Sequence, residues 1–507
     1  MPSQLFLTKS HATLMEEVRG ENRLRRVLGP VQLSSLGVGA IIGTGIFVLT
    51  GVAAHDLTGP ALMLSFVVSG MTCIFAALCY AEFASMAPVA GSAYTYAYAT
   101  LGELFAWIIG WDLILEYAVA SATVAHGWSH YFQNFLSIFH IALPQVFTNA
   151  PFDYDLNAGH VFLTGTWFDL PAIAIAAIVT VVLVKGIRES ASVNTVIVIL
   201  KLAIVFFVIG LGSFYVNPAN WRPFAPYGFS GLSFFGHTVL GQPGPGGNPQ
   251  GMLAGAALVF FAYIGFDSIS THAEEARNPT RDVPIGIMTS LVLCTVLYIA
   301  MAAVLTGMVP YNNINIDAPV SDAFRVVGLP WAQFLVSIGA VAGITSVLLV
   351  MMLSQPRIFL AMARDGLLPT GFFAAIHERF RTPWKSTILT GVFVAAMGAF
   401  LPLRFLADLV NIGTLLAFVM VCAAVLIMRR THPDVHRPFR APFGAIVPVL
   451  GILSCLMLMF SLPVANWVRL VVWLLIGFVI YFSYGIHHSR LGILKRSENA
   501  TSAVSQD

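Results

Sequence analysis

Long apolar segments alternate with short polar ones along most of this chain. Apolar runs of 18 residues or more recur between Val31 and His487, and one such run is long enough to cross about 30 Å of hydrocarbon as a helix. Segments rich in Gly, Pro or charged residues separate the runs. The pattern predicts an all-α polytopic membrane protein with about twelve transmembrane helices. The predicted spans are 32–56, 60–82, 102–137, 168–186, 191–215, 252–275, 283–309, 329–362, 384–401, 404–429, 446–463 and 467–488.

The composition supports a membrane protein, and the lack of catalytic motifs argues against an enzyme. The chain is 57% hydrophobic and 10% charged, with a mean hydropathy of +0.82, whereas about 25% of residues are charged in a typical soluble domain. All five cysteines fall inside the predicted spans, so we expect no disulfide framework. The sequence has no nucleophile–base pair and no nucleotide-binding loop of the GxxxxGK[ST] kind. We therefore expect no enzymatic activity, no cofactor and no nucleic-acid partner.

The positions of the basic residues predict the orientation in the membrane. If the chain starts in the cytoplasm, 21 of the 26 Lys and Arg residues lie on the inner side and four on the outer side. Cytoplasmic loops of membrane proteins carry such an excess. We expect a multi-pass protein of the cell (inner) membrane with both termini cytoplasmic. Residues 1–31, which lack a signal-peptide cleavage pattern, form a cytoplasmic segment, and residues 489–507 form a disordered cytoplasmic tail.

The first span, with the sequence GVGAIIGTGIFVLTG at residues 37–51, carries five glycines. Each costs about 0.5–1 kcal/mol relative to alanine inside a helix. The Gly-Thr-Gly at residues 43–45 would unwind the helix and free amide N–H groups that attract a carboxylate. The carbonyls freed at the end of the first half-helix would attract an ammonium. Close packing of two helices at the glycines is the alternative explanation.

The sixth span has an interruption of its own, at residues 263–266, followed by Asp267. Broken segments at the first of spans 1–5 and the first of spans 6–10 are typical of transporters built from inverted repeats, with the binding site between the two breaks. A zwitterion, with a carboxylate and an ammonium, would fit such a site. The two breaks together favour a binding site over simple helix packing.

Five segments of the sequence also resemble a known family: GVGAIIGTGIF, PVAGSAYTYAYATLGE, GWDLILEY, FFAYIGFDSISTHAEEARNPTRDVPIGI and SQPRIFLAMARDGLLP. They are similar to the amino acid–polyamine–organocation superfamily, and most similar to bacterial homologues of the cationic amino acid transporters. The resemblance implies the LeuT-type fold, a five-plus-five inverted repeat in which helices 1 and 6 are discontinuous. The repeat core would be residues 32–429, followed by helices 11 and 12 at residues 430–488.

The resemblance also implies which residues hold the substrate. The substrate carboxylate would bind at residues 43–45, and the ammonium at carbonyls of the first and sixth spans. Phe261 would cover the substrate as an aromatic gate, Met351 would contact its side chain, and two carboxyls would lie near the pocket. The implied substrate-binding residues are Ile41, Gly43, Thr44, Gly45, Glu116, Phe261, Ile264, Asp267 and Met351.

Ionisable residues inside spans are costly and are candidates for function. Lys201 follows the start of its span by about ten residues, or roughly 15 Å. Similar transporters place a lysine where sodium-coupled relatives bind the cation, which implies coupling to protons without sodium. A snorkelling lysine or a structural ion pair is the alternative. Glu116 and Asp112 lie one helical turn apart and repel each other when charged, and Asp267 has helix capping as its alternative role.

His126 and His130 also lie one turn apart on a single helix face. A structural or catalytic metal needs at least a third protein ligand, and no His, Cys or carboxylate follows at a convincing spacing. From the sequence we therefore expect no metal site.

The sequence predicts a secondary active amino acid transporter that works by alternating access. Its substrates would be cationic (arginine, lysine or ornithine), small and neutral such as alanine, or both. Its partners would be the L-amino acid, protons and membrane lipids, with room for an unidentified small membrane subunit. Exchange of one amino acid for another and a non-transporting membrane sensor are the alternatives.

Overall fold

The computed structural model describes residues 2–9, 28–86, 92–155, 160–186, 191–235, 237–241, 243–244 and 249–496. Most of the basic segment that precedes the first span lies outside the described residues, as do residues 497–507 of the predicted tail. Residues 490–496, where we expected disorder, are helical.

Helices make up most of the described chain. The helices of eight residues or more are α3 (Pro30–Ile41), α5 (Leu62–Met86), α6 (Ser92–Thr100), α7 (Glu103–Ile138), α8 (Leu170–Lys185), α9 (Ala191–Ser213), α10 (Met252–Val259), α12 (Pro279–Met308), α13 (Pro319–Val326), α14 (Pro330–Arg364), α16 (Trp384–Phe400), α17 (Leu403–Thr431), α18 (Ile446–Ser461) and α19 (Val464–Ile480). The shorter α-helices are α1 (Pro2–Leu5), α4 (Thr50–Ala53), α11 (Ser268–Thr271), α15 (Thr370–Phe373) and α20 (Ile486–His488).

Two small antiparallel hairpins complete the described structure. One pairs β1 (Phe152–Asp155) with β2 (His160–Leu163), and the other pairs β3 (Leu232–Phe234) with β4 (His237–Leu240). Neither hairpin was expected, and neither were α6 and α13. At eight or nine residues, α6 and α13 are too short to cross a bilayer, so a search for apolar spans misses them.

The described chain contains seven helical segments that are long and apolar enough to cross a membrane, together with five shorter apolar helices. The chain is therefore a polytopic, mostly helical membrane protein. The predicted spans coincide with these helices, and the ends differ by a few residues. The largest shifts are of four residues: α5 ends at Met86 rather than at 82, and α12 begins at Pro279 rather than at 283. Proline is well tolerated in the first turn of a helix.

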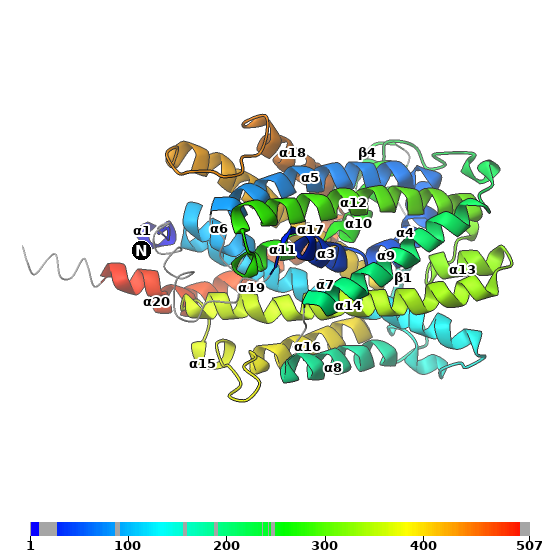
Figure 1. Cartoon of the computed structure of the whole chain (residues 1–507), viewed down its shortest axis with the longest axis horizontal. Helices are drawn as coiled ribbons and strands as arrows, with labels where there is room; N and C mark the ends of the chain where they lie inside the picture. Colours follow the sequence, from blue (N-terminus) through cyan, green and yellow to red (C-terminus); the bar gives the residue numbers. More distant parts are fainter. Residues whose placement is uncertain are drawn as a thin grey trace, which may run out of the picture.

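The long helices run side by side along the longest axis of the molecule (Figure 1). α5 and α12 pack together on one side, and α8 and α16 pack together on the opposite side. α7 packs against both α14 and α17, and α3 packs against α12. The broken helices are thus enclosed by long continuous ones. Both α1 and α20 lie at one end of the molecule, and β4 and α13 lie at the other end.

Buried polar contacts hold together the end of the molecule that carries α20. The carboxylate of Glu103 accepts hydrogen bonds from Tyr98 and Tyr481, at 2.9 Å each, and from Ser489. The amide of Arg490 donates to the carbonyl of Asp365 at 3.0 Å. These contacts give the helical segment 490–496 a fixed attachment to the membrane helices.

Candidate functional site

The first predicted break is present in the structure. α3 ends at Ile41, and Ile42 has an extended backbone with ψ of 101°. The helix resumes as a π-helical turn at Gly45–Leu49. Because the first N–H groups of a helix have no partner within it, this restart presents backbone donors at residues 43–45. The end of α3 presents carbonyls in the same way.

The second break lies in the sixth predicted span. α10 continues into a tight turn at Phe260–Tyr263, Ile264 is extended with ψ of 135°, and α11 starts after Asp267. Gly265 has φ of +116°, a conformation that side chains other than glycine rarely adopt. A Cβ atom at Gly265 would lie 3.0 Å from the carbonyl oxygen of Ala40 and 3.0 Å from the Met351 methyl group. The second break therefore rests against the end of α3 and against α14.

The two breaks cross at close range. A Cβ atom at Gly45 would lie 2.3 Å from the backbone Cα of Ala262, and one at Gly43 would lie 2.8 Å from Cγ2 of Val347. The structure therefore shows both an interrupted helix and close helix packing at these glycines. The glycines interrupt the helix, and they also let the second half of the first span approach the sixth span and α14.

Tyr298 of α12, which sequence analysis did not single out, joins the two breaks. Its buried hydroxyl lies 2.9 Å from the carbonyl oxygen of Ile41 and 2.9 Å from that of Ala262. One hydroxyl hydrogen is shared between two acceptors at the ends of two interrupted helices. Nothing in the local sequence around Tyr298 signals this role, because it depends on the packing of α12 against α3.

Lys201 of α9 also binds the end of α3. Its ammonium donates to the carbonyl of Gly39 at 2.7 Å and to that of Ile42 at 3.1 Å. The residue is 2% exposed, so its side chain does not reach a membrane surface. Of the two alternatives to a coupling role, the structure excludes snorkelling, because the Nζ atom is enclosed by protein.

Three buried carboxyls lie between α7, α17 and the second break. Asp267 accepts a hydrogen bond of 2.6 Å from the hydroxyl of Tyr117. The Glu116 carboxyl interacts electrostatically with Asp267 and Asp112, and it faces Thr414 of α17. Neither Glu116 nor Asp112 has a hydrogen-bond partner among the described residues. Asp267 thus belongs to the second break itself, whereas Glu116 interacts with this break only electrostatically, through its neighbour Asp267.

The other implied substrate residues all lie at the breaks. Ile41 closes α3, Phe261 and Ile264 form the turn after α10, and Met351 contacts Gly265. All four are 2–6% exposed. The tertiary structure therefore brings residues of the first and sixth spans and of α14 into one buried centre.

A second polar cluster lies nearer the C-terminal end of α7, next to the part of this helix that contacts the first broken span through Gly127 and Tyr131. His126 and His130 lie there together with Asp169. The expectation of no metal site depended on the lack of a third ligand near the histidines in sequence. The fold supplies a third candidate ligand from a segment about 40 residues further along the chain.

Comparison with known proteins identifies the family. The amino acid permease family matches residues 28–484. The chain is 47% identical over 492 residues to a branched-chain amino acid permease of Bacillus subtilis, which covers 97% of this chain and 100% of that protein. It is 43% identical over 491 residues to a methylthioribose transporter of the same organism, covering 96% and 99% of the two chains.

More distant similarity extends to eukaryotic proteins. The cationic amino acid transporter 4 of Mus musculus is 37% identical over 419 residues, which are 82% of this chain and 61% of that protein. The predicted relation to the cationic transporters is thereby confirmed. The paired helix breaks, the buried centre between them and these similarities lead to one conclusion: the chain belongs to the amino acid permease family, a family of membrane transporters and not of enzymes.

Proposed function

We propose that this protein is a secondary active transporter that carries L-amino acids across the cell membrane by alternating access. The observation that supports it most is the close crossing of the two broken helices, at Gly45 and Ala262. Transporters with inverted repeats bind substrate where such discontinuous helices meet. The proposal includes a five-plus-five repeat over residues 32–429, two further helices at residues 430–488 and cytoplasmic termini.

The two poles of an amino acid match the two kinds of backbone group at the breaks. The amides at residues 43–45 and the positive end of the helix that follows would hold the carboxylate. The carbonyls of Ile41, Phe261 and Ile264 would accept from the ammonium. A carbonyl oxygen has two lone pairs, so the Ile41 carbonyl can accept from Tyr298 and from substrate together.

For the side chain of the substrate, we favour neutral aliphatic amino acids over cationic ones. Val347, Met351 and Phe261 surround the breaks with apolar groups. Asp267 accepts from Tyr117 at Oδ2 and its Oδ1 has no hydrogen-bond partner among the described residues, so this carboxylate by itself favours neither class of substrate. The similarity to a branched-chain amino acid permease supports the same choice. Arginine, lysine and ornithine, and alanine as a smaller neutral substrate, are the competitors.

We also propose coupling to protons without sodium. The Lys201 ammonium lies against the unwound first span, and a second cation beside it would be repelled strongly in a buried site. Free sodium is therefore redundant at this position.

Transport by the purified protein in proteoliposomes tests the proposal. Leucine, valine, alanine, arginine and methylthioribose are offered in turn, with proton and sodium gradients imposed separately. We expect the fastest uptake for leucine or valine, stimulation by an acidic outside, and no change when sodium is replaced by potassium. Sodium-dependent uptake would contradict the coupling proposal, and no uptake of any amino acid would contradict the function. Uptake that needs amino acid inside the vesicle and ignores the proton gradient would identify an exchanger.

A further inference from the structure

His126, His130 and Asp169 form a compact cluster at the end of the molecule opposite to α1 and α20. The histidine rings lie one helical turn apart on α7, with centroids 4.7 Å from each other. Asp169 is the residue that precedes α8. One nitrogen of each ring and one carboxylate oxygen all lie within 4.8 Å of one another.

Asp169 keeps one oxygen free for a ligand. Its Oδ1 accepts from the Ser129 hydroxyl at 2.6 Å and from the Ala172 amide at 3.0 Å, which caps α8. Its Oδ2 is buried, has no hydrogen-bond partner among the described residues, and lies 3.5 Å from Nδ1 of His126. A buried carboxylate oxygen without a partner is costly. The helix cap accounts for Oδ1, whereas Oδ2 has only the 3.5 Å approach to His126 among the described residues.

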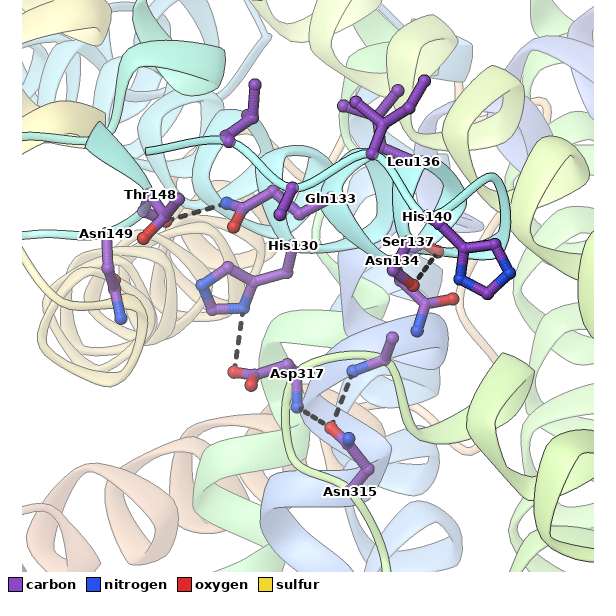
Figure 2. A pocket seen from close by; sticks show the side chains of 14 residues that line it. His130, Gln133, Asn134, Leu136, Ser137, His140, Thr148, Asn149, Asn315 and Asp317 are labelled. Atoms are coloured by element: carbon purple, nitrogen blue, oxygen red, sulfur yellow. Dashed lines mark hydrogen bonds and ion pairs between the residues drawn. The ribbon is translucent and has the colours of Figure 1, made fainter. Parts of the chain in front are cut away.

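A cavity of about 650 Å³ borders the cluster at His130, whereas His126 and Asp169 are buried behind it. His130 lines this cavity, and Figure 2 shows its ring facing Asp317 on the connection between α12 and α14. The distance from His130 Nδ1 to Asp317 Oδ1 is 3.2 Å. Asp317 is therefore a further carboxylate in contact with the cluster, and its side chain is 61% exposed.

We propose that His126, His130 and Asp169 bind a divalent transition-metal ion of the zinc type, with Asp317 or water as the fourth ligand. Imidazole and carboxylate are ordinary zinc ligands, at about 2.0–2.2 Å from the metal. Magnesium and calcium prefer sites made of oxygen alone. His126 Nδ1 would donate to the carbonyl of Gly398 at 3.0 Å and Nε2 would be the ligand atom, so that this carbonyl orients the ring.

Binding needs only a small contraction of the cluster. Ligand atoms of a tetrahedral zinc site lie about 3.3 Å apart, compared with separations of up to 4.8 Å here. The bound ion would link α7, the start of α8 and, through Asp317, the connection between α12 and α14. These segments are separate in sequence.

The test is metal binding to the purified full chain after treatment with a chelator. Calorimetric titration with Zn²⁺ and the visible absorption of bound Co²⁺ measure it directly, without transport. We expect one site in the wild type and no response to Mg²⁺. Asp169→Asn keeps a capping oxygen but loses the carboxylate, and His130→Gln loses the imidazole. Each should weaken binding by about tenfold or more. His140→Gln, in the same cavity but outside the cluster, is the matched control.

Thermal unfolding of each metal-free variant shows whether it is folded. If Asp169→Asn unfolds, His130→Gln decides the question. The proposal is overturned if the wild type binds no Zn²⁺. It is overturned equally if a folded Asp169→Asn or His130→Gln variant binds as tightly as the wild type, or if His140→Gln loses binding to the same extent.

Discussion

At the scale of single residues, the first break depends on the missing side chain of Gly45 and on the charged side chain of Lys201. Glycine at position 45 lets the backbone of the first span approach the backbone at Ala262 so closely that a Cβ atom at this position would clash with it. Lys201 supplies a buried charge to the backbone carbonyls of an interrupted helix. In lipid an interrupted helix survives only where protein satisfies its freed groups, and these two residues act on opposite sides of the same interruption.

Adding one methyl group at Gly45 should therefore disrupt the site. In Gly45→Ala the new Cβ would meet the Cα of Ala262 at 2.3 Å, and backbone cannot yield as a side chain can. We expect a loss of about 1–3 kcal/mol of stability and uptake lowered by about tenfold or more. Gly210→Ala is the control, because a Cβ there meets nothing within 4 Å and alanine favours the helix by up to about 1 kcal/mol. Thermal unfolding and substrate uptake measure both effects. Undiminished uptake by Gly45→Ala would show that substrate binding does not need a glycine at this position.

Two substitutions at Lys201 should distinguish the effect of its positive charge from the effect of its size and shape. Lys201→Ala loses two charge-assisted hydrogen bonds to α3, each contributing about 1.5–3 kcal/mol, so we expect weaker substrate binding and no response of uptake to external pH. Lys201→Arg retains a positive charge on a larger, planar group that does not release its proton, so binding should persist while turnover falls. Uptake at several external pH values, with binding measured separately, tests both variants. A normal pH response in Lys201→Ala would place the proton site elsewhere, with Glu116 and Asp267 as the next candidates.

At the scale of elements, α7 connects the proposed substrate site with the proposed metal site. Near its middle it places Glu116 and Tyr117 against the second break, and about two and a half to four turns later it carries His126 and His130. Because α7 packs along both α14 and α17, it forms a continuous support on which the broken helices rest. The carboxyls of Asp112, Glu116 and Asp267 repel one another when charged. The packing of the helices that carry them therefore holds them close together.

Neutralising Glu116 tests what this arrangement does. Glu116→Gln keeps the size of the side chain and removes one of three neighbouring acidic groups. We expect a folded protein with an unchanged ratio of arginine to leucine uptake and a weaker response to external pH. Glu82→Gln is the contrast, because Glu82 bonds to Arg429 and its loss should lower the unfolding temperature. A fall of about tenfold or more in the arginine-to-leucine ratio of Glu116→Gln would instead indicate a charge-assisted contact with a cationic substrate.

At the scale of the whole molecule, the distribution of basic residues predicts the orientation in the membrane. In the proposed topology the end with α1 and α20 would face the cytoplasm, and the His126 cluster would lie on the outer side. All five cysteines are free and buried, so the wild type should react little with a membrane-impermeant maleimide. This makes the native chain a suitable background for single introduced cysteines.

We expect Ala219→Cys, in the exposed turn after α9, to be labelled in intact cells. Asp434→Cys, in the exposed connection after α17, should be labelled only after permeabilisation. The reason is that an odd number of predicted spans precedes position 219 and an even number precedes position 434. The labelled fraction of each variant, before and after permeabilisation, measures its side. The reverse pattern would invert the proposed topology.

The sequence by itself determined the membrane class, the positions of the helices and the two interruptions. These features are readable locally, because a chain in lipid must satisfy its backbone within each helix, so apolar length and glycine position carry the information. The limits of α7 and α14 follow the predicted spans to within two residues. The short α6 and α13 were missed because neither leaves a span-length apolar signal.

Only the tertiary structure decided which distant groups meet. The hydroxyl of Tyr298 bonds to Ile41, 257 residues away, and Lys201 bonds to Gly39, 162 residues away. Asp169 joins two histidines of another helix in the same way. Such contacts depend on how helices pack and not on the pattern within any one of them. The sequence therefore predicted where the backbone breaks, and the packing of the helices decided which side chains surround the breaks.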